Sequence, residues 1–475
     1  MTASNEGKNT YDLVIIGSGP GGYIAAVRAG QLGLKTAIVE REELGGVCLN
    51  WGCIPSKALL RAAEVLNLFQ HAKEFGISVN GVDADYGAAI ERCRGIIDRQ
   101  TKGVAYLMKK NKVDVVRGTG RVASSQEVIV QTANGEEHLA TRNVLIATGS
   151  RVRLVPGMSP DTVDGKTVIT SKEVWQLNDQ PRSVIIIGGG PIGVEFATVY
   201  RSYGADVTIV EMLPRLVPLE DEDVSAHLTR EFKKRGSNIM TSTKVLKVEK
   251  GGEGRQASVQ VESAEGGNKT LQADRVLMGI GFAPNSENLG LENLGVNIQR
   301  GFIQVDEQMK TNVPGIYAIG DVTGKLALAH VASAMGVVAA EVIAGHPYAK
   351  LDYNAMPRCT YSQPNIASIG LTEAQCKEQG LDIKVGKFLF NPNGKAQAMG
   401  EASGFVKIIS DAKYGEVLGA HLIGPEVVEL IGEFSLLKTL EGTNLELAST
   451  VHPHPTLSEA LAEAALAVDG IALNA

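Results

Sequence analysis

The chain has 475 residues, of which 44% are hydrophobic and 21% are charged, a balance typical of a globular protein with several domains. Its net charge of −7 argues against a nucleic-acid-binding surface, which requires a stripe of basic residues. The sequence contains no run of about eighteen apolar residues, so we expect no membrane span.

The N-terminal residues, MTASNEGKNT, do not combine a basic segment with an apolar one, as a secretory signal would. Five cysteines in a chain of this length, without such a signal, suggest a reducing compartment. We therefore expect a cytoplasmic protein in which any disulfide is catalytic rather than structural.

The first predicted elements, in residues 11–40, are a strand, a glycine turn, a helix and a second strand that ends at Glu40. Gly17, Gly19 and Gly22 form a G-x-G-x-x-G pattern. The first glycine allows a tight turn, the second admits a pyrophosphate, and the third lets the helix pack on the strand. The helix N-terminus attracts phosphates, and Glu40 can accept hydrogen bonds from ribose hydroxyls. The pattern predicts a dinucleotide site. The alternative is an ordinary turn whose glycines serve packing alone.

Next, residues 45–57 read GGVCLNWGCIPSK, in which Cys48 and Cys53 lie five positions apart. A regular helix would hold their Cα atoms about 8–9 Å apart. A disulfide tolerates about 7 Å at most. If the two cysteines pair, the segment between them cannot be a regular helix. Gly52 and the Gly45–Gly46 pair supply the backbone freedom for an interruption.

Pro55 suits the first turn of the helix that follows, which places Cys53 near a helix N-terminus, where a thiolate is favoured. Lys57 can add a positive charge nearby. The alternatives are two buried cysteines in an apolar helix, or a zinc site, which would need more ligands close by. The remaining cysteines stand alone and are expected to be inert: Cys93, Cys359 and Cys376.

The buried strand VLIATGS (144–150) is expected to close the first nucleotide-binding region. A second copy of the strand–turn–helix–strand pattern then begins at Ser183, displaced by 171 residues, as from Gly17 to Gly188. At this single offset the following positions coincide: Gly17 with Gly188, Gly19 with Gly190, Gly22 with Gly193, Gly33 with Gly204, and Glu40 with Glu211. Two nucleotide sites in one chain predict two different cofactors. The strand VLMGIGFAPN (276–285) is expected to close the second region.

The strand TNVPGIYAIGDV (311–322) brings Asp321 to a carboxyl end, where residues of open α/β sheets bind ligands. The alternative is an aspartate that only caps a turn. The helix that follows, at 326–345, is mostly apolar and is expected to be buried. From about Tyr353 the strands alternate with helices in a pattern that predicts a separate α+β domain.

With the first glycine pattern, GGVCLNWGCIPSK resembles the signature of the FAD-dependent pyridine nucleotide–disulfide oxidoreductases. Among these, essentially the whole chain is most similar to the dihydrolipoamide dehydrogenases (E3). The resemblance implies an α/β fold with two Rossmann-like dinucleotide-binding domains and a C-terminal α+β dimerisation domain. The implied domains are 1–152 for FAD, 153–281 for NAD, 282–352 completing the FAD site, and 353–475 for the interface.

The resemblance also implies the residues that bind the cofactors. Those expected at FAD are Gly17, Gly19, Gly22, Glu40, Lys57, Gly120, Asp321 and Ala329. Those expected at NAD are Gly188, Gly190, Gly193, Glu211, Val245 and Gly281. Glu195 would pair with Lys57 beside the flavin. Many relatives have arginine after the glycine that matches Gly281, where this chain has Phe282, so that contact with the nicotinamide cofactor is in doubt.

Residues 451–460, VHPHPTLSEA, resemble the catalytic base motif of the same family. His454 would take a proton from a substrate thiol, and Glu459 would orient its imidazole. Thr456 and Glu459 also match a capping box at the start of the next helix, and both interpretations of Glu459 can hold together. His452, beside the base, is the residue most easily mistaken for it, and is otherwise expected to be an exposed histidine in a proline-rich turn.

The reaction implied is the oxidation of protein-bound dihydrolipoamide through Cys48 and Cys53, with FAD and NAD as cofactors and no metal. The implied partners are a second copy of the chain and the lipoyl domains of 2-oxoacid dehydrogenase complexes or the glycine cleavage H protein. Which complex is served does not follow from the sequence. Glutathione reductase is the nearest rival, but Glu211 would repel the 2′-phosphate of NADPH. A flavin-binding scaffold without turnover is the alternative from another class.

Overall fold

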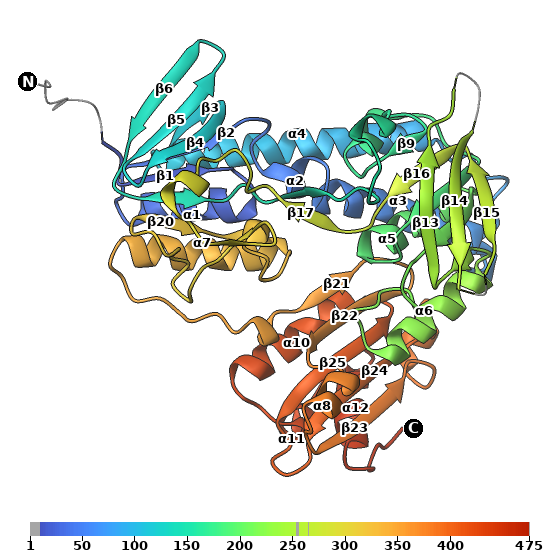
Figure 1. Ribbon diagram of the computed structural model, residues 1–475. Helices are drawn as coiled ribbons and strands as arrows, with labels where there is room; N and C mark the ends of the chain where they lie inside the picture. Colours follow the sequence, from blue (N-terminus) through green and yellow to red (C-terminus); the bar gives the residue numbers. More distant parts are fainter. Residues whose placement is uncertain (1–9, 253–255, 265, 475) are drawn as a thin grey trace, which may run out of the picture. The chain divides into compact units, whose positions relative to one another are not determined.

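The computed structural model describes residues 10–252, 256–264 and 266–474, coloured along the chain in Figure 1. This part of the chain divides into two compact units, and each is described by itself. Unit 1 takes its residues from Met1–Pro55, Arg92–Arg153 and Phe282–Tyr353, and unit 2 from Ser56–Glu91, Leu154–Gly281 and Asn354–Ala475. The four-domain division of the sequence stays a prediction.

Unit 1 is built on a parallel sheet of order β20-β7-β1-β2-β3. The strands are β1 (Leu13–Ile16), β2 (Thr36–Glu40), β3 (Asp114–Arg117), β7 (Val144–Ile146) and β20 (Ile316–Ala318). The residues of β1 and β2 are buried, as expected for a parallel sheet covered on its faces. The carboxyl ends of these strands meet at one edge, which brings Gly17, Glu40 and Asp321 to the same side of the sheet.

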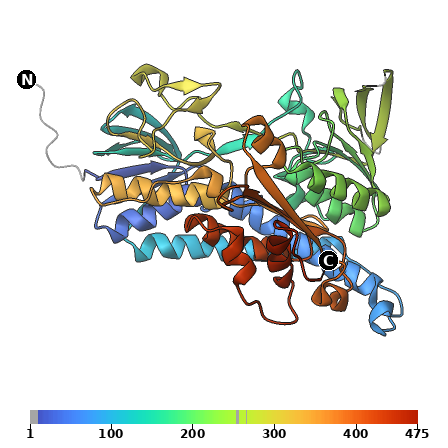
Figure 2. The ribbon, with the colours of Figure 1, turned by 90° about the horizontal axis from the view of Figure 1, so that it is seen from below.

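Helices α1 (Pro20–Gln31) and α7 (Ala329–Ile343) lie side by side in unit 1, as the dark-blue and orange helices in Figures 1 and 2 show. Glycine permits this close approach, because a Cβ atom on Gly336 would lie 2.5 Å from the carbonyl oxygen of Gly21. The remaining strands of the unit are β4 (Thr119–Ser124), β5 (Glu127–Thr132), β6 (Gly135–Ala140), β8 (Ser150–Val152), β17 (Phe282–Pro284), β18 (Ile298–Gln299) and β19 (Phe302–Ile303). The short helix α2 (Gly46–Asn50) also belongs to it.

Unit 2 repeats the nucleotide-binding pattern in a parallel sheet of order β12-β11-β10-β16-β9. Its strands are β9 (Val168–Ile169), β10 (Ser183–Ile187), β11 (Asp206–Val210), β12 (Asn238–Met240) and β16 (Arg275–Met278). Helix α5 (Pro191–Ser202) stands at the same offset of 171 residues from α1 as the glycines of the two patterns do. Helix α6 (Glu222–Lys234) follows β11, and an antiparallel sheet of β13 (Thr243–Glu249), β14 (Ala257–Ser263) and β15 (Asn268–Ala273) is inserted before β16.

The C-terminal part of unit 2 is an antiparallel sheet of order β21-β22-β25-β24-β23. Its strands are β21 (Arg358–Thr360), β22 (Asn365–Gly370), β23 (Ile383–Leu389), β24 (Phe405–Asp411) and β25 (Val417–Gly424). The helices are α8 (Glu373–Glu378), α9 (Gly394–Met399), α10 (Val427–Thr439), α11 (Asn444–Ser449) and α12 (Glu459–Ala467).

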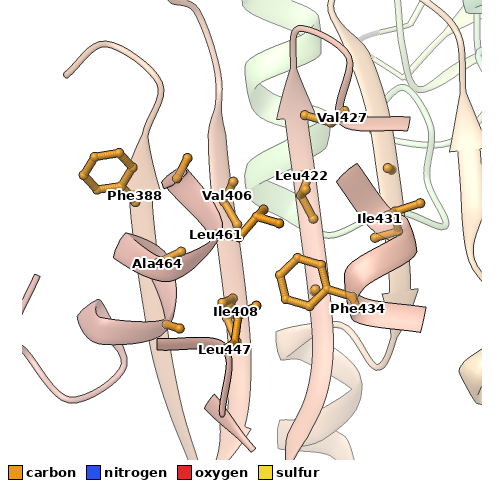
Figure 3. Packing of buried hydrophobic residues seen from close by; sticks show 14 of the residues in the cluster. Phe388, Val406, Ile408, Leu422, Val427, Ile431, Phe434, Leu447, Leu461 and Ala464 are labelled. Atoms are coloured by element: carbon orange, nitrogen blue, oxygen red, sulfur yellow. The ribbon is translucent and has the colours of Figure 1, made fainter. Parts of the chain in front are cut away.

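Figure 3 shows the core of this domain, in which Ile431 and Phe434 of α10 and Leu461 of α12 point onto the sheet beside Val406 and Leu422. Burying each such side chain stabilises the fold by about 1.5–3 kcal/mol. The predicted fold class, two Rossmann-like regions followed by an α+β domain, is confirmed.

The residues of two long helices are divided between the two units: α3 (Cys53–Gln70) and α4 (Tyr86–Lys110). Neither they nor any other helix within the described ranges is long and apolar enough to cross a membrane.

Candidate active site and nucleotide sites

The glycine turn after β1 has the geometry that a dinucleotide site needs. Gly17 has φ +101°, and a Cβ atom there would lie 2.4 Å from the carbonyl oxygen of Ala147. A Cβ atom on Gly22 would lie 2.0 Å from the carbonyl oxygen of Gly17, so the helix can pack only on glycine. At Gly19, by contrast, none of the described atoms lies within 4 Å of such a Cβ. The open side of the turn is therefore at the glycine expected to face the pyrophosphate.

The turn after β10 repeats this geometry position by position. Gly188 has φ +108°, and its Cβ would lie 2.3 Å from the carbonyl oxygen of Gly279. A Cβ on Gly193 would lie 1.9 Å from the carbonyl oxygen of Gly188, whereas no described atom lies within 4 Å of one at Gly190. Both turns therefore fit a dinucleotide. Packing alone does not explain why the second glycine of each turn is a glycine, because no described atom would contact a Cβ atom there.

Glu40 is buried at the end of β2 and ties the first turn to that strand. Its Oε2 atom accepts hydrogen bonds from the backbone N–H of Ser18, at 2.9 Å, and from the Ser18 hydroxyl, at 2.7 Å. Its Oε1 atom accepts one from the N–H of Glu42, at 2.8 Å. These bonds hold the carboxylate beside the turn, where it can also accept hydrogen bonds from a ribose.

Glu211 is held in the corresponding way after β11. Its two oxygens accept hydrogen bonds from the N–H groups of Gly189, at 2.6 Å, and Leu213, at 2.7 Å. The N–H of Thr243 donates to the Glu211 carbonyl oxygen at 2.9 Å, which brings the start of β13, and so Val245 two residues on, toward this site. Gly281, with φ +94°, follows β16, the strand beside β10.

Three further residues predicted for the first site lie in unit 1. Asp321 follows β20 and accepts a hydrogen bond from the Ser150 hydroxyl at 2.6 Å, and burial raises the pKa of its carboxyl group. Ala329 is the first residue of α7. Gly120 is buried on β4, where a Cβ atom would lie 3.3 Å from Ile16, the last residue of β1. Asp321, Ala329 and Gly120 thus all lie in unit 1, and their contacts with FAD stay predictions.

The segment that carries the cysteine pair is interrupted, as the distance limit for a disulfide predicted. Helix α2 ends at Asn50 and α3 begins at Cys53, so the two cysteines lie on different helices. Gly45 and Gly46 both have positive φ, +95° and +58°. A Cβ atom on Gly52 would lie 2.9 Å from the Val47 carbonyl oxygen, so the turn between the helices also requires glycine.

Cys53 stands at the N-terminus of α3, and Pro55 lies in its first turn, both as predicted. The Cys48 and Cys53 side chains are half-buried, and Cys48 packs on a small apolar cluster that includes Leu44 and Leu49. Their pairing stays a prediction.

The three other cysteines behave as inert side chains. Burial raises the pKa of both Cys93 and Cys359 to about 11, and it raises that of Cys376 as well. Few thiolates would form there at neutral pH.

Lys57 and Glu195, which the resemblance paired, do form an ion pair in unit 2. The lysine Nζ atom lies 3.0 and 2.9 Å from the two oxygens of Glu195, which is buried on α5. The position of Lys57 beside a flavin stays a prediction.

His454 and Glu459 also meet as predicted, with 2.8 Å between the histidine Nδ1 atom and the glutamate Oε1 atom. The other oxygen of Glu459 accepts a hydrogen bond from the N–H of Thr456 at 2.8 Å. Although burial opposes it, these hydrogen bonds hold the pKa of Glu459 below its usual range. The Thr456 hydroxyl donates to the Pro453 carbonyl instead of capping the helix, so the capping box is only half formed.

Glu459 therefore orients the imidazole and satisfies a backbone donor at once. The Nδ1 atom faces Glu459, and the His454 side chain is 79% exposed. The role of His454 as a base stays a prediction.

The expectation of an exposed His452 is wrong. Its side chain is only 5% exposed, and its Nε2 atom lies 3.0 Å from a carboxylate oxygen of Glu433 on α10. His452 and Glu433 are 19 residues apart in the sequence, and their contact holds the ring against α10. The proline-rich residues around His452 gave no indication of this partner. The exposed ring is that of His454.

The described residues contain no group of three or more His, Cys, Asp or Glu side chains that could hold a metal ion.

The comparison with protein families agrees with this geometry. Residues 11–336 match the model described as pyridine nucleotide-disulphide oxidoreductase, and residues 356–465 match the dimerisation domain of the same family. The chain belongs to this family. Its members are FAD-dependent oxidoreductases that use a pyridine nucleotide, and the second match indicates a homodimer.

Several members of the family are similar over almost their full length. A dihydrolipoyl dehydrogenase of Rhizobium etli is 49% identical, over 98% of this chain and 99% of its own. Another, of Mycobacterium tuberculosis, is 51% identical over 95% of this chain and 97% of its own.

Among solved structures, LpdA of Mycobacterium tuberculosis matches with a TM-score of 0.87 and 28% identity, over 95% of this chain and 98% of that one. The flavoprotein disulfide reductase RclA of Escherichia coli matches with a TM-score of 0.85 and 27% identity, over 96% of this chain and 99% of that one.

One feature of the site carried no signal in the sequence. Ser18 donates two hydrogen bonds to Glu40, but it occupies a variable position of the G-x-G-x-x-G pattern, where the pattern does not specify the residue type. The sequence did mark Phe282, which opens β17 and pairs with Val152 of β8 in unit 1.

Proposed function

We propose that the protein is a dihydrolipoyl dehydrogenase, which oxidises protein-bound dihydrolipoamide to lipoamide and reduces NAD⁺ to NADH. The observation that carries this proposal is the near-full-length similarity, at 49–51% identity, to enzymes of that name. It is supported by the cysteine pair on an interrupted helix and by the His454–Glu459 pair.

The residues that would hold the cofactors follow the two glycine turns. FAD would be bound by Gly17, Gly19, Gly22, Glu40, Lys57, Gly120, Asp321 and Ala329. NAD would be bound by Gly188, Gly190, Gly193, Glu211, Val245 and Gly281, with Glu195 holding Lys57. When bound, FAD supplies the two-electron transfer between the reduced cysteine pair and the nicotinamide.

The chain's own residues carry the thiol chemistry, which starts from the Cys48–Cys53 disulfide. His454 accepts a proton from one substrate thiol at its Nε2 atom. The resulting thiolate attacks the sulfur of Cys48, a substrate–Cys48 disulfide forms, and Cys53 leaves as a thiolate. The second substrate thiol, once deprotonated, attacks the substrate sulfur of that disulfide and releases Cys48. Two electrons have then moved from the substrate dithiol to the cysteine pair.

The same chemistry limits the partners and the compartment. A dithiol carried on a lipoyl domain, of a 2-oxoacid dehydrogenase complex or of the glycine cleavage H protein, is the substrate that this cycle consumes. We place the enzyme in the cytoplasm, because a cysteine pair that is reduced in every cycle suits a reducing compartment.

The experiment that tests the function is the replacement Cys48→Ser. It removes the sulfur that the substrate attacks, so dihydrolipoamide-dependent NADH formation should fall at least about a thousandfold, while FAD stays bound. The measurement is steady-state turnover beside the flavin absorbance of the purified protein.

The matched control is Cys93→Ala, at a buried cysteine outside the pair, which should keep near-normal turnover. Normal lipoamide turnover in Cys48→Ser would show that the disulfide mechanism is wrong.

A further inference from the structure

The ammonium group of Lys57 has a second neighbour besides Glu195. Its Nζ atom lies 4.6 Å from the centre of the Tyr361 ring. This distance is within the roughly 6 Å over which a cation is attracted to the face of an aromatic ring. The lysine side chain is partly exposed to solvent, so water competes for the ammonium group and Glu195 does not confine it alone.

Tyr361 is itself held in place from several sides. Its backbone N–H donates a hydrogen bond to Oε1 of Glu195 at 2.9 Å. Two residues on, the N–H of Gln363 donates to the Thr198 hydroxyl on α5 at 3.3 Å, and its side-chain oxygen accepts a hydrogen bond from Asn67 of α3 at 2.6 Å. The loop after β21 is thus fixed to the two helices that carry Lys57 and Glu195, and the ring cannot readily move away.

We propose that Tyr361 is a positioning residue, whose ring and backbone N–H together hold the Lys57–Glu195 pair in one geometry. This inference rests on the proposed function, in which Lys57 lies beside the flavin. A positive charge fixed there stabilises the negative charge that the bound flavin carries once it is reduced. Tyr361 acts through Lys57, since its ring contacts the ammonium group.

The test is the flavin reduction equilibrium of the holoenzyme, followed by absorbance against a reference dye and without lipoamide. Tyr361→Leu keeps the backbone N–H but removes the ring. It should shift the ratio of reduced to oxidised flavin, at a fixed potential, about 3- to 10-fold toward the oxidised form. Tyr361→Phe keeps the ring face and should behave like the wild type. A role limited to packing would lower the melting temperature without moving this equilibrium.

A double-mutant cycle with Lys57→Met isolates the contact. If Tyr361 acts through Lys57, Tyr361→Leu should change nothing further once Lys57→Met is present. Equal flavin equilibria in Tyr361→Leu and the wild type, or fully additive shifts in the double variant, would overturn the proposal.

If Tyr361→Leu does not retain FAD, the test uses phenylalanine with increasing ring fluorination at position 361 instead. Fluorination keeps the shape of the ring but weakens its attraction for the ammonium group of Lys57. The equilibrium should then shift in step with fluorination, and the lack of a trend would equally overturn the proposal. Since no lipoamide is present, these results stay readable even if the wild type proves unable to oxidise dihydrolipoamide.

Discussion

Glu40 and Glu211 stand at equivalent positions of the two repeats, and both already accept backbone hydrogen bonds from their glycine turns. A carboxylate has about four acceptor positions, so these bonds leave room for ribose hydroxyls. The backbone bonds also fix where the remaining lone pairs point. We therefore expect the same residue to shape the glycine turn and to bind the ribose, which would join cofactor binding to local folding.

Replacing Glu211 with Gln should therefore change the choice of nicotinamide cofactor. The variant loses the charge that repels a 2′-phosphate and weakens the hydrogen bonds to the ribose. We expect the KM for NADH to rise about tenfold, the equivalent of one charged hydrogen bond, and the preference for NADH over NADPH to narrow. Steady-state kinetics with both cofactors measure this.

The repeat supplies the matched control for that experiment. Glu40→Gln changes the equivalent residue of the first turn, so it should weaken FAD retention and leave the NADH to NADPH ratio unaltered. An unchanged ratio in Glu211→Gln, or wild-type enzyme that uses NADPH more efficiently than NADH, would refute the assignment of Glu211.

What could be predicted at this scale depended on how far apart the partners lie in the sequence. His454 and Glu459 belong to one short motif, and they do form a hydrogen bond. The partner of His452 is Glu433, on α10. Besides Glu195, Lys57 contacts Tyr361, some three hundred residues away in the sequence and at 4.6 Å in the fold. A pattern along the chain marks neither contact, because only the tertiary fold creates it.

At the scale of elements, the break between α2 and α3 was predictable, because the Cα–Cα distance that a disulfide tolerates and three nearby glycines all bear on the same dozen residues. The attachment of α6 to the C-terminal sheet could not be predicted from the sequence. Lys407 of β24, with a side chain only 4% exposed, lies 2.9 Å from Asp221, 3.2 Å from Asp223 and 2.7 Å from Glu373. Asp221 also caps α6, accepting a hydrogen bond from the N–H of Asp223 at 3.1 Å.

One buried lysine thus joins α6 and α8 to the sheet, and Lys407→Met should break this junction. The buried carboxylate of Asp221 would be left without its cation, at a cost of about 3–5 kcal/mol. The control is Lys387→Met. Lys387 lies opposite Lys407 in the register of β23 and β24 and forms an ion pair with Asp223, but its side chain is 38% exposed. An exposed ion pair contributes about 1 kcal/mol or less. Thermal unfolding of both variants measures the difference.

The pH dependence of this effect has a definite sign. Although burial opposes it, hydrogen bonds from Lys407 hold the pKa of Asp221 below its ordinary value, and Lys377 and Lys407 lower that of Glu373. Groups with a depressed pKa stabilise the fold above their unfolded values, about 3.9–4.3, and this contribution is lost as the pH falls through the folded values. The gap between Lys407→Met and wild type should therefore hold from pH 7 to about pH 4 and shrink as the pH falls further. A gap that stays constant below about pH 4 would contradict this.

At the scale of the molecule, the repeat in the sequence predicted both nucleotide-binding regions, since one offset aligns α1 with α5 as well as the glycines. The sequence could not show which cysteine pair His454 serves. The histidine lies in the C-terminal domain of unit 2, about 400 residues after Cys53 of unit 1. That domain matches a dimerisation domain. We predict that each subunit gives its histidine to the cysteine pair of the other.

Mixing two inactive chains tests this arrangement. Cys53→Ser and His454→Gln should each be inactive as homodimers. If the site is shared in a two-fold dimer, a mixed dimer has one site with both lesions and one site that is wholly native. Equal amounts of the two chains give mixed dimers for about half of the total, with one active site of two, so about a quarter of wild-type activity should return. If His454 instead acts within its own chain, every site keeps one lesion. Mixed dimers identified by two affinity tags would then show no recovery, which would rule out the shared site while leaving the thiol chemistry intact.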